Sequence, residues 1–76
     1  MFKDEKVYSN RAAVCLKLKH YRECIDDSTT AISMDNNFLK PYFRRGQAYQ
    51  ALTKYKEAID DYQFILSKDP KNKKVT

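Results

Sequence analysis

The chain has 76 residues, of which 42% are hydrophobic, and a formal net charge of +5. This length suits one small domain or a piece of a larger one, and the apolar content is too high for a disordered chain. The sequence has no apolar run long enough to cross a bilayer, and MFKDEKVYSN at its start is too polar for a secretory signal. The two cysteines, Cys15 and Cys24, lie in helical patterns. We therefore expect reduced thiols in a cytosolic or nuclear compartment, and a cytoplasmic protein.

Apolar and small residues recur at helical spacing in four segments, which predicts helices near residues 4–18, 21–34, 39–52 and 55–68. The residues that carry this spacing are, in chain order, Tyr8, Ala12, Cys15 and Leu18; Cys24, Ile25, Ser28, Ala31 and Ile32; Tyr42, Gly46, Tyr49 and Leu52; and Ala58, Ile59, Tyr62, Ile65 and Leu66. Pro41 would lie in the first turn of the third helix, where a missing N–H is tolerated. No segment alternates with a period of two, so we expect no strands and an all-α fold class.

The sequence repeats itself with a period of 34 residues. The identities at this shift are Tyr8 with Tyr42, Arg11 with Arg45, Leu18 with Leu52, Tyr21 with Tyr55, Glu23 with Glu57, Ile25-Asp26-Asp27 with Ile59-Asp60-Asp61, and Asp35 with Asp69. This period is the length of two helices and two turns, which is one helical hairpin. We therefore expect a single region over 1–76, with repeat one at about 5–38, repeat two at about 39–72 and a basic tail at 73–76.

Small and aromatic residues recur in the order that is typical of the tetratricopeptide repeat. The matching residues are Tyr42, Gly46, Tyr49, Tyr55, Ala58, Tyr62, Ile65 and Pro70 in the second copy, and Tyr8, Ala12, Cys15, Tyr21, Cys24, Ser28 and Ala31 in the first, with Asn36 in place of the proline. The chain resembles this family over roughly residues 5 to 71. The resemblance implies two stacked helix–turn–helix hairpins, with four antiparallel helices, as a fragment of a right-handed superhelical solenoid. Ala12 and Gly46 would each face the partner helix of their own hairpin, opposite Cys24 and Ala58.

Charge is sorted by helix. Segments 3–19 and 39–54 have net charges of +3 and +4, whereas segments 21–35 and 55–69 have −3 and −2. The first helix of each hairpin is thus basic, and stacked first helices line one common surface. Two stripes share a helix face there: Lys6, Asn10, Ala13 and Lys17, and one repeat later Lys40, Arg44, Gln47 and Ala51. We expect a positive groove that suits an extended acidic ligand.

The stretches YSNRAA at 8–13 and KPYFRRGQAY at 40–49 resemble the second and third repeats of the carboxylate-clamp subclass of this family. That subclass binds the acidic C-terminal tails of the seventy- and ninety-kilodalton heat-shock chaperones. The residues that the resemblance implies are Asn10, Lys40 and Arg44 for the carboxylates, and Lys6, Ala13, Phe43 and Gln47 along the groove. It also implies a co-chaperone or assembly-factor adaptor rather than an enzyme, with no cofactor.

The subclass also takes a Lys and an Asn from a preceding repeat, and a capping helix usually follows. Neither is found in these 76 residues, so we expect the inner two repeats of a longer domain, with an incomplete clamp. About three units are usually needed for a stable stack, so two should be marginally stable or associate through their uncapped ends.

Two other functions remain open at this point. The chain could be a general scaffold that binds another folded protein without a chaperone tail, or a basic helical module that binds nucleic acid. Binding that depends on the free C-terminal carboxylate of a peptide would favour the chaperone-tail function over the general scaffold. Binding that weakens steeply with salt and shows no peptide preference would indicate a nucleic-acid-binding module. Most aromatic residues occupy repeat-core positions, which does not favour base stacking. We expect no membrane association.

Two arginines and one phenylalanine have competing interpretations. Arg11 and Arg45 stand where ordinary repeats carry a bulky apolar residue. We expect packed stems with the charged ends on acidic neighbours, rather than ligand contacts. Phe43 could contact a ligand or pack against the next repeat.

Residues that could suggest a metal site or catalysis are better explained by the fold. Cys15, His20 and Cys24 are one ligand short of a structural zinc site, so we expect no metal. The pairs Asp26-Asp27 and Asp60-Asp61 recur in register, and adjacent helix residues point about 100° apart, which does not favour paired catalytic carboxylates.

Overall fold

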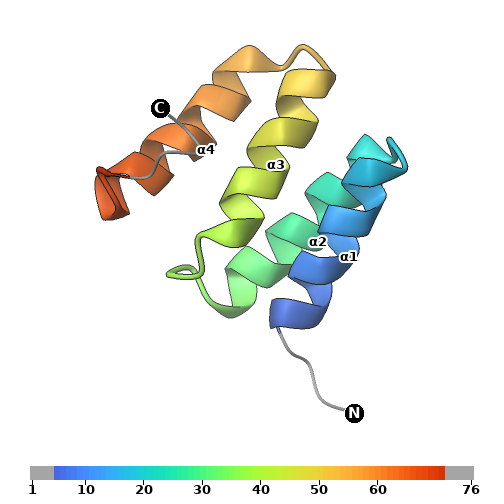
Figure 1. The fold of residues 1–76 in the computed structure, drawn as a ribbon, viewed down its shortest axis with the longest axis horizontal. Helices are drawn as coiled ribbons and strands as arrows, with labels where there is room; N and C mark the ends of the chain where they lie inside the picture. Colours follow the sequence, from blue (N-terminus) through green and yellow to red (C-terminus); the bar gives the residue numbers. More distant parts are fainter. Residues whose placement is uncertain (1–4, 72–76) are drawn as a thin grey trace.

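The computed structural model of the chain describes residues 5–71 and consists of four α-helices (Figure 1). They are α1 (Glu5–Lys17), α2 (Tyr21–Met34), α3 (Lys40–Ala51) and α4 (Tyr55–Lys68). No strand occurs in the described residues, and the predicted all-α fold class is confirmed. Each helix begins and ends within one residue of the predicted position. The predicted tail at 73–76 lies outside the described residues.

The two hairpin turns have the same geometry. Lys19 and Thr53 stand one period apart and have φ angles of 63° and 61°, in the left-handed region. In both turns the next N–H donates at 2.8 Å to a carbonyl five residues back, that of Cys15 or Tyr49. This is the Schellman arrangement that commonly ends a helix. It reverses the chain over a few residues, so α1 lies against α2, and α3 lies against α4.

Helix α3 lies in the middle of the molecule (Figure 1). It packs against α1, α2 and α4, whereas α4 packs against no other described helix than α3. The α1–α2 hairpin and the α3–α4 hairpin therefore stack through α3. The two basic helices, α1 and α3, are neighbours in this stack, so their exposed stripes belong to adjacent elements.

Small side chains form the centre of the contact between the hairpins. Ala12, Cys24 and Ala48 come from α1, α2 and α3, pack together and are fully buried. The partly buried side chains around them are Cys15, Leu16, Tyr21 and Ile25. The Cys24 thiol donates to the backbone oxygen of Arg44 at 3.6 Å, which joins α2 to α3. Burial raises the pKa of Cys24 above its ordinary value, so the thiol stays protonated.

Gly46, the single glycine of the chain, lies on α3 where this helix packs tightly against α4. A Cβ at this position would lie 2.5 Å from Cε1 of Tyr62. Since a contact this short is repulsive, any side chain here would displace the ring or separate the helices. The predicted close packing against the partner helix is confirmed, and the side chain nearest to this position is that of Tyr62, one turn after Ala58. In repeat one Ala12 supplies the Cβ, and Ser28 stands at the position of Tyr62.

Candidate functional site

The basic stripe on α3 consists of Lys40, Arg44, Gln47 and Ala51. Lys40 is exposed, whereas Arg44 and Gln47 are half-buried. Nη1 of Arg44 donates to Oε1 of Gln47 at 3.5 Å, and the guanidinium carbon lies 5.7 Å from the centre of the Phe43 ring. The ring and the amide restrict the Arg44 side chain without neutralising its charge, because neither is a carboxylate.

The stripe on α1 consists of Lys6, Asn10, Ala13 and Lys17. Lys6 and Asn10 are exposed, and Ala13 is half-buried. Because α1 packs against α3, helix packing brings the two stripes onto neighbouring helices (Figure 1). Asn10 also lines an open hollow of about 440 Å³, whose other lining residues are Arg11, Val14, Cys15 and Glu23. Asn10 therefore lies at the rim between the basic surface and this hollow.

Phe43 packs within its own repeat. Its ring centre lies 6.3 Å from that of Tyr62 on α4, and the rings are tilted by 48°. The hydroxyl of Tyr62 donates to Oε1 of Gln50 at 3.0 Å. Burial, and then the charge of Asp61, raise the pKa of Tyr62. The two roles weighed for Phe43 were a ligand contact and packing on the next repeat; the structure adds an aromatic partner inside the hairpin.

Arg45 differs from Arg44 because its charge is already paired. Its Nε and Nη2 donate to the carboxylate of Asp61 on α4 at 2.9 and 2.6 Å, and its Nη1 donates to Oγ1 of Thr29 on α2 at 3.2 Å. The side chains of Arg45 and Asp61 are only 19% and 6% exposed. The hydrogen bond to Asp61 raises the pKa of Arg45. The prediction of a packed stem with its charged end on an acidic neighbour is confirmed for Arg45.

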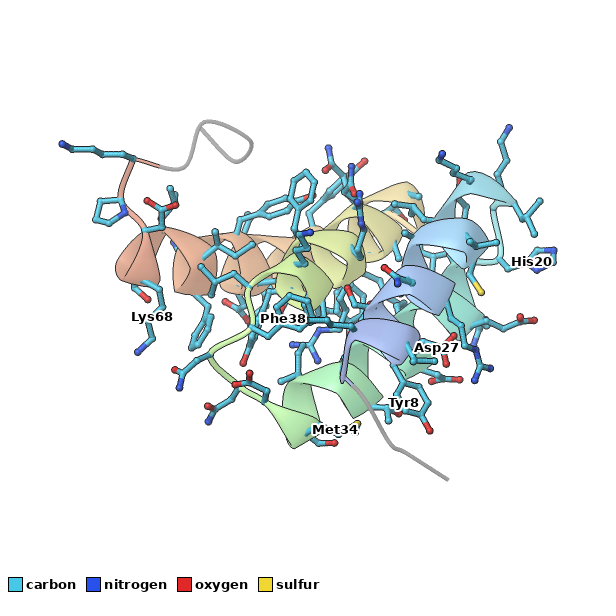
Figure 2. All side chains as sticks on the ribbon, turned by 60° about the horizontal axis from the view of Figure 1, so that its bottom comes forward. Tyr8, His20, Asp27, Met34, Phe38 and Lys68 are labelled. Atoms are coloured by element: carbon cyan, nitrogen blue, oxygen red, sulfur yellow. The ribbon has the colours of Figure 1, made fainter. Side chains whose placement is uncertain are left out.

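Arg11, the counterpart of Arg45, is held more loosely. Its Nε lies 3.5 Å from Oδ2 of Asp27, and its side chain is 63% exposed. Its guanidinium carbon lies 5.7 Å from the centre of the Tyr8 ring, and Figure 2 shows Tyr8 and Asp27 on the same side of the α1–α2 hairpin. The acidic neighbour was predicted correctly. The packed stem was not, because no helix of the described chain covers this side of α1.

Cys15 lies near two carboxylates: its Sγ is 3.9 Å from Oε2 of Glu23 and 4.0 Å from Oδ2 of Asp27. Cys15 and Cys24 are free thiols, and among the described residues no three His, Cys, Asp or Glu side chains lie close enough to hold a metal ion. His20 Nδ1 lies 3.7 Å from a carboxylate oxygen of Glu23, at the exposed turn labelled in Figure 2. Desolvation and then Asp27 and Glu23 raise the pKa of Cys15, which disfavours a reactive thiolate. In this part of the chain no helix is both long and apolar enough to cross a membrane.

Two contacts at this site were not anticipated from the sequence. One is the hydrogen bond from Arg45 to Thr29, which has no counterpart in the repeat pattern because Gln63 stands one period after Thr29. The other is the Tyr62 ring against Gly46. The sequence contains a signal for this second contact, because Gly46 and Tyr62 occur together in repeat two, whereas the corresponding residues of repeat one are Ala12 and Ser28.

A comparison with known proteins agrees with this geometry. Residues 40–72 match the family described as Tetratricopeptide repeat. With its period of 34 residues, the chain folds as two stacked helical hairpins of the tetratricopeptide-repeat type.

Similar curated proteins include an import receptor subunit and a co-chaperone. The chain is 46% identical over 63 residues to the human Mitochondrial import receptor subunit TOM34, a match covering 83% of this chain and 20% of that protein. It is 38% identical over 73 residues to the Hsp70/Hsp90 co-chaperone CNS1 of Saccharomyces cerevisiae, covering 95% of this chain and 19% of that protein. The chain thus spans about a fifth of the length of these curated relatives.

Among solved structures, the chain is similar to the second TPR domain of the human RPAP3 protein, determined by NMR in complex with the HSP70 peptide SGPTIEEVD. The TM-score is 0.91 with 36% sequence identity, and the match covers 95% of this chain and 60% of that one. At this identity the likeness extends to the sequence as well as to the fold.

Proposed function

We propose that the chain is a protein-interaction module that holds the acidic C-terminal peptide of a heat-shock chaperone on the basic surface of α1 and α3. The observation that carries this proposal is that, within the described residues, Arg44 pairs with no carboxylate and is held by neutral side chains. It is half-buried and restrained by Phe43 and Gln47, and it lies one turn after the exposed Lys40. The helix that holds both has no acidic residue.

The chemistry of these side chains suits carboxylates. Lys40 and Arg44 can each give charge-assisted hydrogen bonds, and the restrained rotamer of Arg44 lowers the entropy lost on binding. Asn10 has both a donor and an acceptor, which fits a peptide backbone. In this proposal Lys6, Ala13, Phe43 and Gln47 line the surface beside these three residues. An extended peptide with a terminal carboxylate matches this arrangement.

Relatives support the class of ligand. The peptide bound to the second TPR domain of human RPAP3 ends in Glu-Glu-Val-Asp, so it presents acidic side chains next to a free C-terminus. CNS1 is named as a co-chaperone of Hsp70 and Hsp90. We extend this to the present chain as an adaptor for a chaperone tail that acts in the cytoplasm, rather than as an enzyme.

Calorimetric titration of the 76-residue chain with SGPTIEEVD tests the proposal, because the same peptide can be made with a free or an amidated C-terminus. We expect amidation, Lys40→Ala and Arg44→Ala each to weaken binding by about 1.5–3 kcal/mol, which is roughly 10-fold to 150-fold in Kd. Lys40 is exposed, so Lys40→Ala tests the contact without disturbing packing.

Lys54→Ala provides a matched control. Lys54 is exposed and lines a different hollow, between Ile25 and Leu52, so this variant has the same net charge as Lys40→Ala but leaves the basic surface intact. It should bind like the unmodified chain. Equal affinity for both peptides, or equal losses in Lys40→Ala and Lys54→Ala, would instead indicate a general scaffold or nonspecific attraction to positive charge.

A further inference from the structure

Both hairpin turns are basic and lie along the same edge of the stack (Figure 1). Residues 18–22 read LKHYR and residues 53–56 read TKYK, and neither stretch contains an acidic residue. The repeat places Tyr21 of the first turn at the position of Tyr55 in the second, and each tyrosine stands between two basic residues. None of these residues belongs to the stripes on α1 and α3, so this edge carries a separate positive charge.

Two hollows lie next to each other at this edge, between the two repeats. The first, of about 300 Å³, is lined by residues 19–23 of the first turn and α2 and by Leu52, just after α3. The second, of about 230 Å³, is lined by Arg22, Ile25, Asp26, Leu52 and Lys54. Because Arg22 and Leu52 line both hollows, the two form one groove, which we call the turn groove.

The turn groove belongs to the junction between the repeats. One wall comes from the first turn and α2, and the other comes from Leu52 and Lys54 of the second repeat. Since α2 and α3 pack against each other, the groove is formed by a contact inside the described chain, whatever adjoins either repeat. Lys40 begins α3 and Leu52 follows its end, so the groove lies roughly 18 Å along the helix axis from Lys40.

The floor of the turn groove is apolar and held in place. Tyr21, Ile25 and Leu52 are half-buried. Tyr21 and Ile25 also pack against the buried cluster at the centre of the stack. Their inner edges are therefore fixed while their outer edges remain open to a ligand, so a ligand that packs on them has little of the protein to order.

Three exposed cations surround this floor: Lys19, Arg22 and Lys54. None of them forms an ion pair or a side-chain hydrogen bond with another residue of the described range 5–71. Lys19 lies at the first hollow, Lys54 at the second, and Arg22 at both. Positive charge is thus available along the whole length of the groove.

The two acidic residues of the turn groove do not balance these cations. Oε2 of Glu23 lies 3.7 Å from Nδ1 of His20 and 3.9 Å from Sγ of Cys15, so this carboxylate already has neighbours of its own. Asp26 lines only the second hollow, where it stands with two cations. The groove therefore suits a ligand that is itself acidic.

We propose that the turn groove binds an acidic segment of a partner protein, through an aromatic side chain that stands between two carboxylates. The aromatic ring packs on Leu52 and Tyr21, where aromatic pairs gain beyond their buried area. One carboxylate lies by Lys19 and the other by Lys54, and the guanidinium of Arg22 lies between them and can donate to either. This contact needs no free C-terminus, so it is separate from the chaperone-tail surface of α1 and α3.

A nuclear magnetic resonance titration of the 76-residue chain with acetyl-Glu-Phe-Glu-amide tests this proposal. The backbone amide signals of residues 19–26 and 52–54 should shift, whereas those of residues 40–44 should not. Acetyl-Gln-Phe-Gln-amide lacks the charges and acetyl-Glu-Ala-Glu-amide lacks the ring. Each should bind about 3-fold to 10-fold more weakly than the first peptide.

Single substitutions separate the turn groove from the proposed peptide surface. Arg22→Ala and Lys54→Ala should each weaken binding of acetyl-Glu-Phe-Glu-amide by about 3-fold to 10-fold. Lys40→Ala has the same net charge as Lys54→Ala and should bind this peptide like the unmodified chain. With SGPTIEEVD the order should reverse, since Lys40→Ala weakens that complex and Lys54→Ala does not. All three residues are exposed, and circular dichroism checks that each variant keeps its helices.

Several results would overturn the proposal. They are an absence of shifts at the turn groove, equal binding of the three short peptides, and equal losses in Lys40→Ala and Lys54→Ala. Vesicles of phosphatidylcholine and phosphatidylserine, or a single-stranded oligothymidine, could shift the same signals when the peptide does not. That result would assign this edge to a membrane surface or to nucleic acid instead of a protein segment.

Discussion

The two repeats place the same arginine and aspartate in different states. Arg11 approaches Asp27 through one contact of 3.5 Å and is mostly exposed, whereas Arg45 forms two hydrogen bonds with Asp61 and is mostly buried. The residues and their spacing are identical, so the helix pattern is not the cause. The difference is the neighbour: α3 has a hairpin on its outer side, and α1 has none in the described chain. An adjacent repeat therefore turns a weak surface pair into a structural link.

The largest effect on stability is expected when the two aspartates, Asp61 and Asp27, are replaced one at a time. Asp61→Ala leaves the guanidinium of Arg45 buried without its partner, and should lower the free energy of unfolding by about 3–5 kcal/mol. Asp27→Ala breaks a pair whose arginine is mostly in solvent, and should lower it by about 0–1 kcal/mol. Urea unfolding followed by circular dichroism measures both values, with a stabilising osmolyte added to keep a folded baseline.

The double variant Arg45→Met/Asp61→Leu separates the pair from the packing. Because it removes both charges and keeps apolar volume, it should recover much of the stability lost in Asp61→Ala. Similar losses in Asp61→Ala and Asp27→Ala would contradict the view that the neighbouring repeat sets the strength of the pair.

A smaller effect is expected where α3 packs against α4. Repeat two has Gly46 and the large Tyr62 at this contact, whereas repeat one has Ala12 and the small Ser28. Gly46→Ala places a Cβ against the Tyr62 ring, which should destabilise the chain by about 1–3 kcal/mol, less about 1 kcal/mol for the better helix propensity of alanine. The same urea experiment in a Tyr62→Ala background provides the control. Without the ring, Gly46→Ala should become stabilising, and a loss of the same size in both backgrounds would exclude the contact as its cause.

The smallest effect concerns Cys24, which corresponds to Ala58 in repeat two. Burial raises the pKa of Cys24 from 9.0, so the folded chain keeps a proton that the unfolded chain loses at high pH. This contribution to stability is complete below that value and declines as the pH rises through it toward the folded pKa. Melting temperatures across this range should fall more steeply for the unmodified chain than for Cys24→Ala. The pKa of Tyr62 is also raised by burial, so ionisation of Tyr62 lowers the stability of both proteins at high pH. Parallel melting curves would therefore show that the Cys24 thiol does not contribute.

Much of the fold follows from the sequence because its information is periodic. The period of 34 residues places both hairpin turns, although Lys19 and Thr53 have positive φ angles that neither residue type favours. Because the two turns lie one period apart, the repeat indicates a hairpin turn at each position, which the local propensities of Lys19 and Thr53 would not. The acidic partner of Arg45 was also predictable, since Arg45 and Asp61 recur together with Arg11 and Asp27.

The remaining features depend on packing that differs between the repeats. Burial of Arg45 and exposure of Arg11 depend on what lies beside each helix, which identical residues cannot reveal. The contact of Phe43 with Tyr62 depends on a ring that repeat one lacks. For the candidate site, the sequence predicted the residues, and the structure adds the restraint of Arg44 by Phe43 and Gln47. Their contact with a peptide stays a prediction.

The central position of α3 has a consequence for the order in which the chain opens. Among the described helices, α4 packs against α3 alone, so α4 can detach while the first hairpin stays intact, whereas loss of α3 separates the two hairpins. Local opening should therefore begin at α4, and the backbone amides of α3 should be among the last to exchange with solvent. Lys40 and Arg44 lie on α3. A ligand bound there would stabilise the folded chain as a whole and would be released when the two repeats come apart.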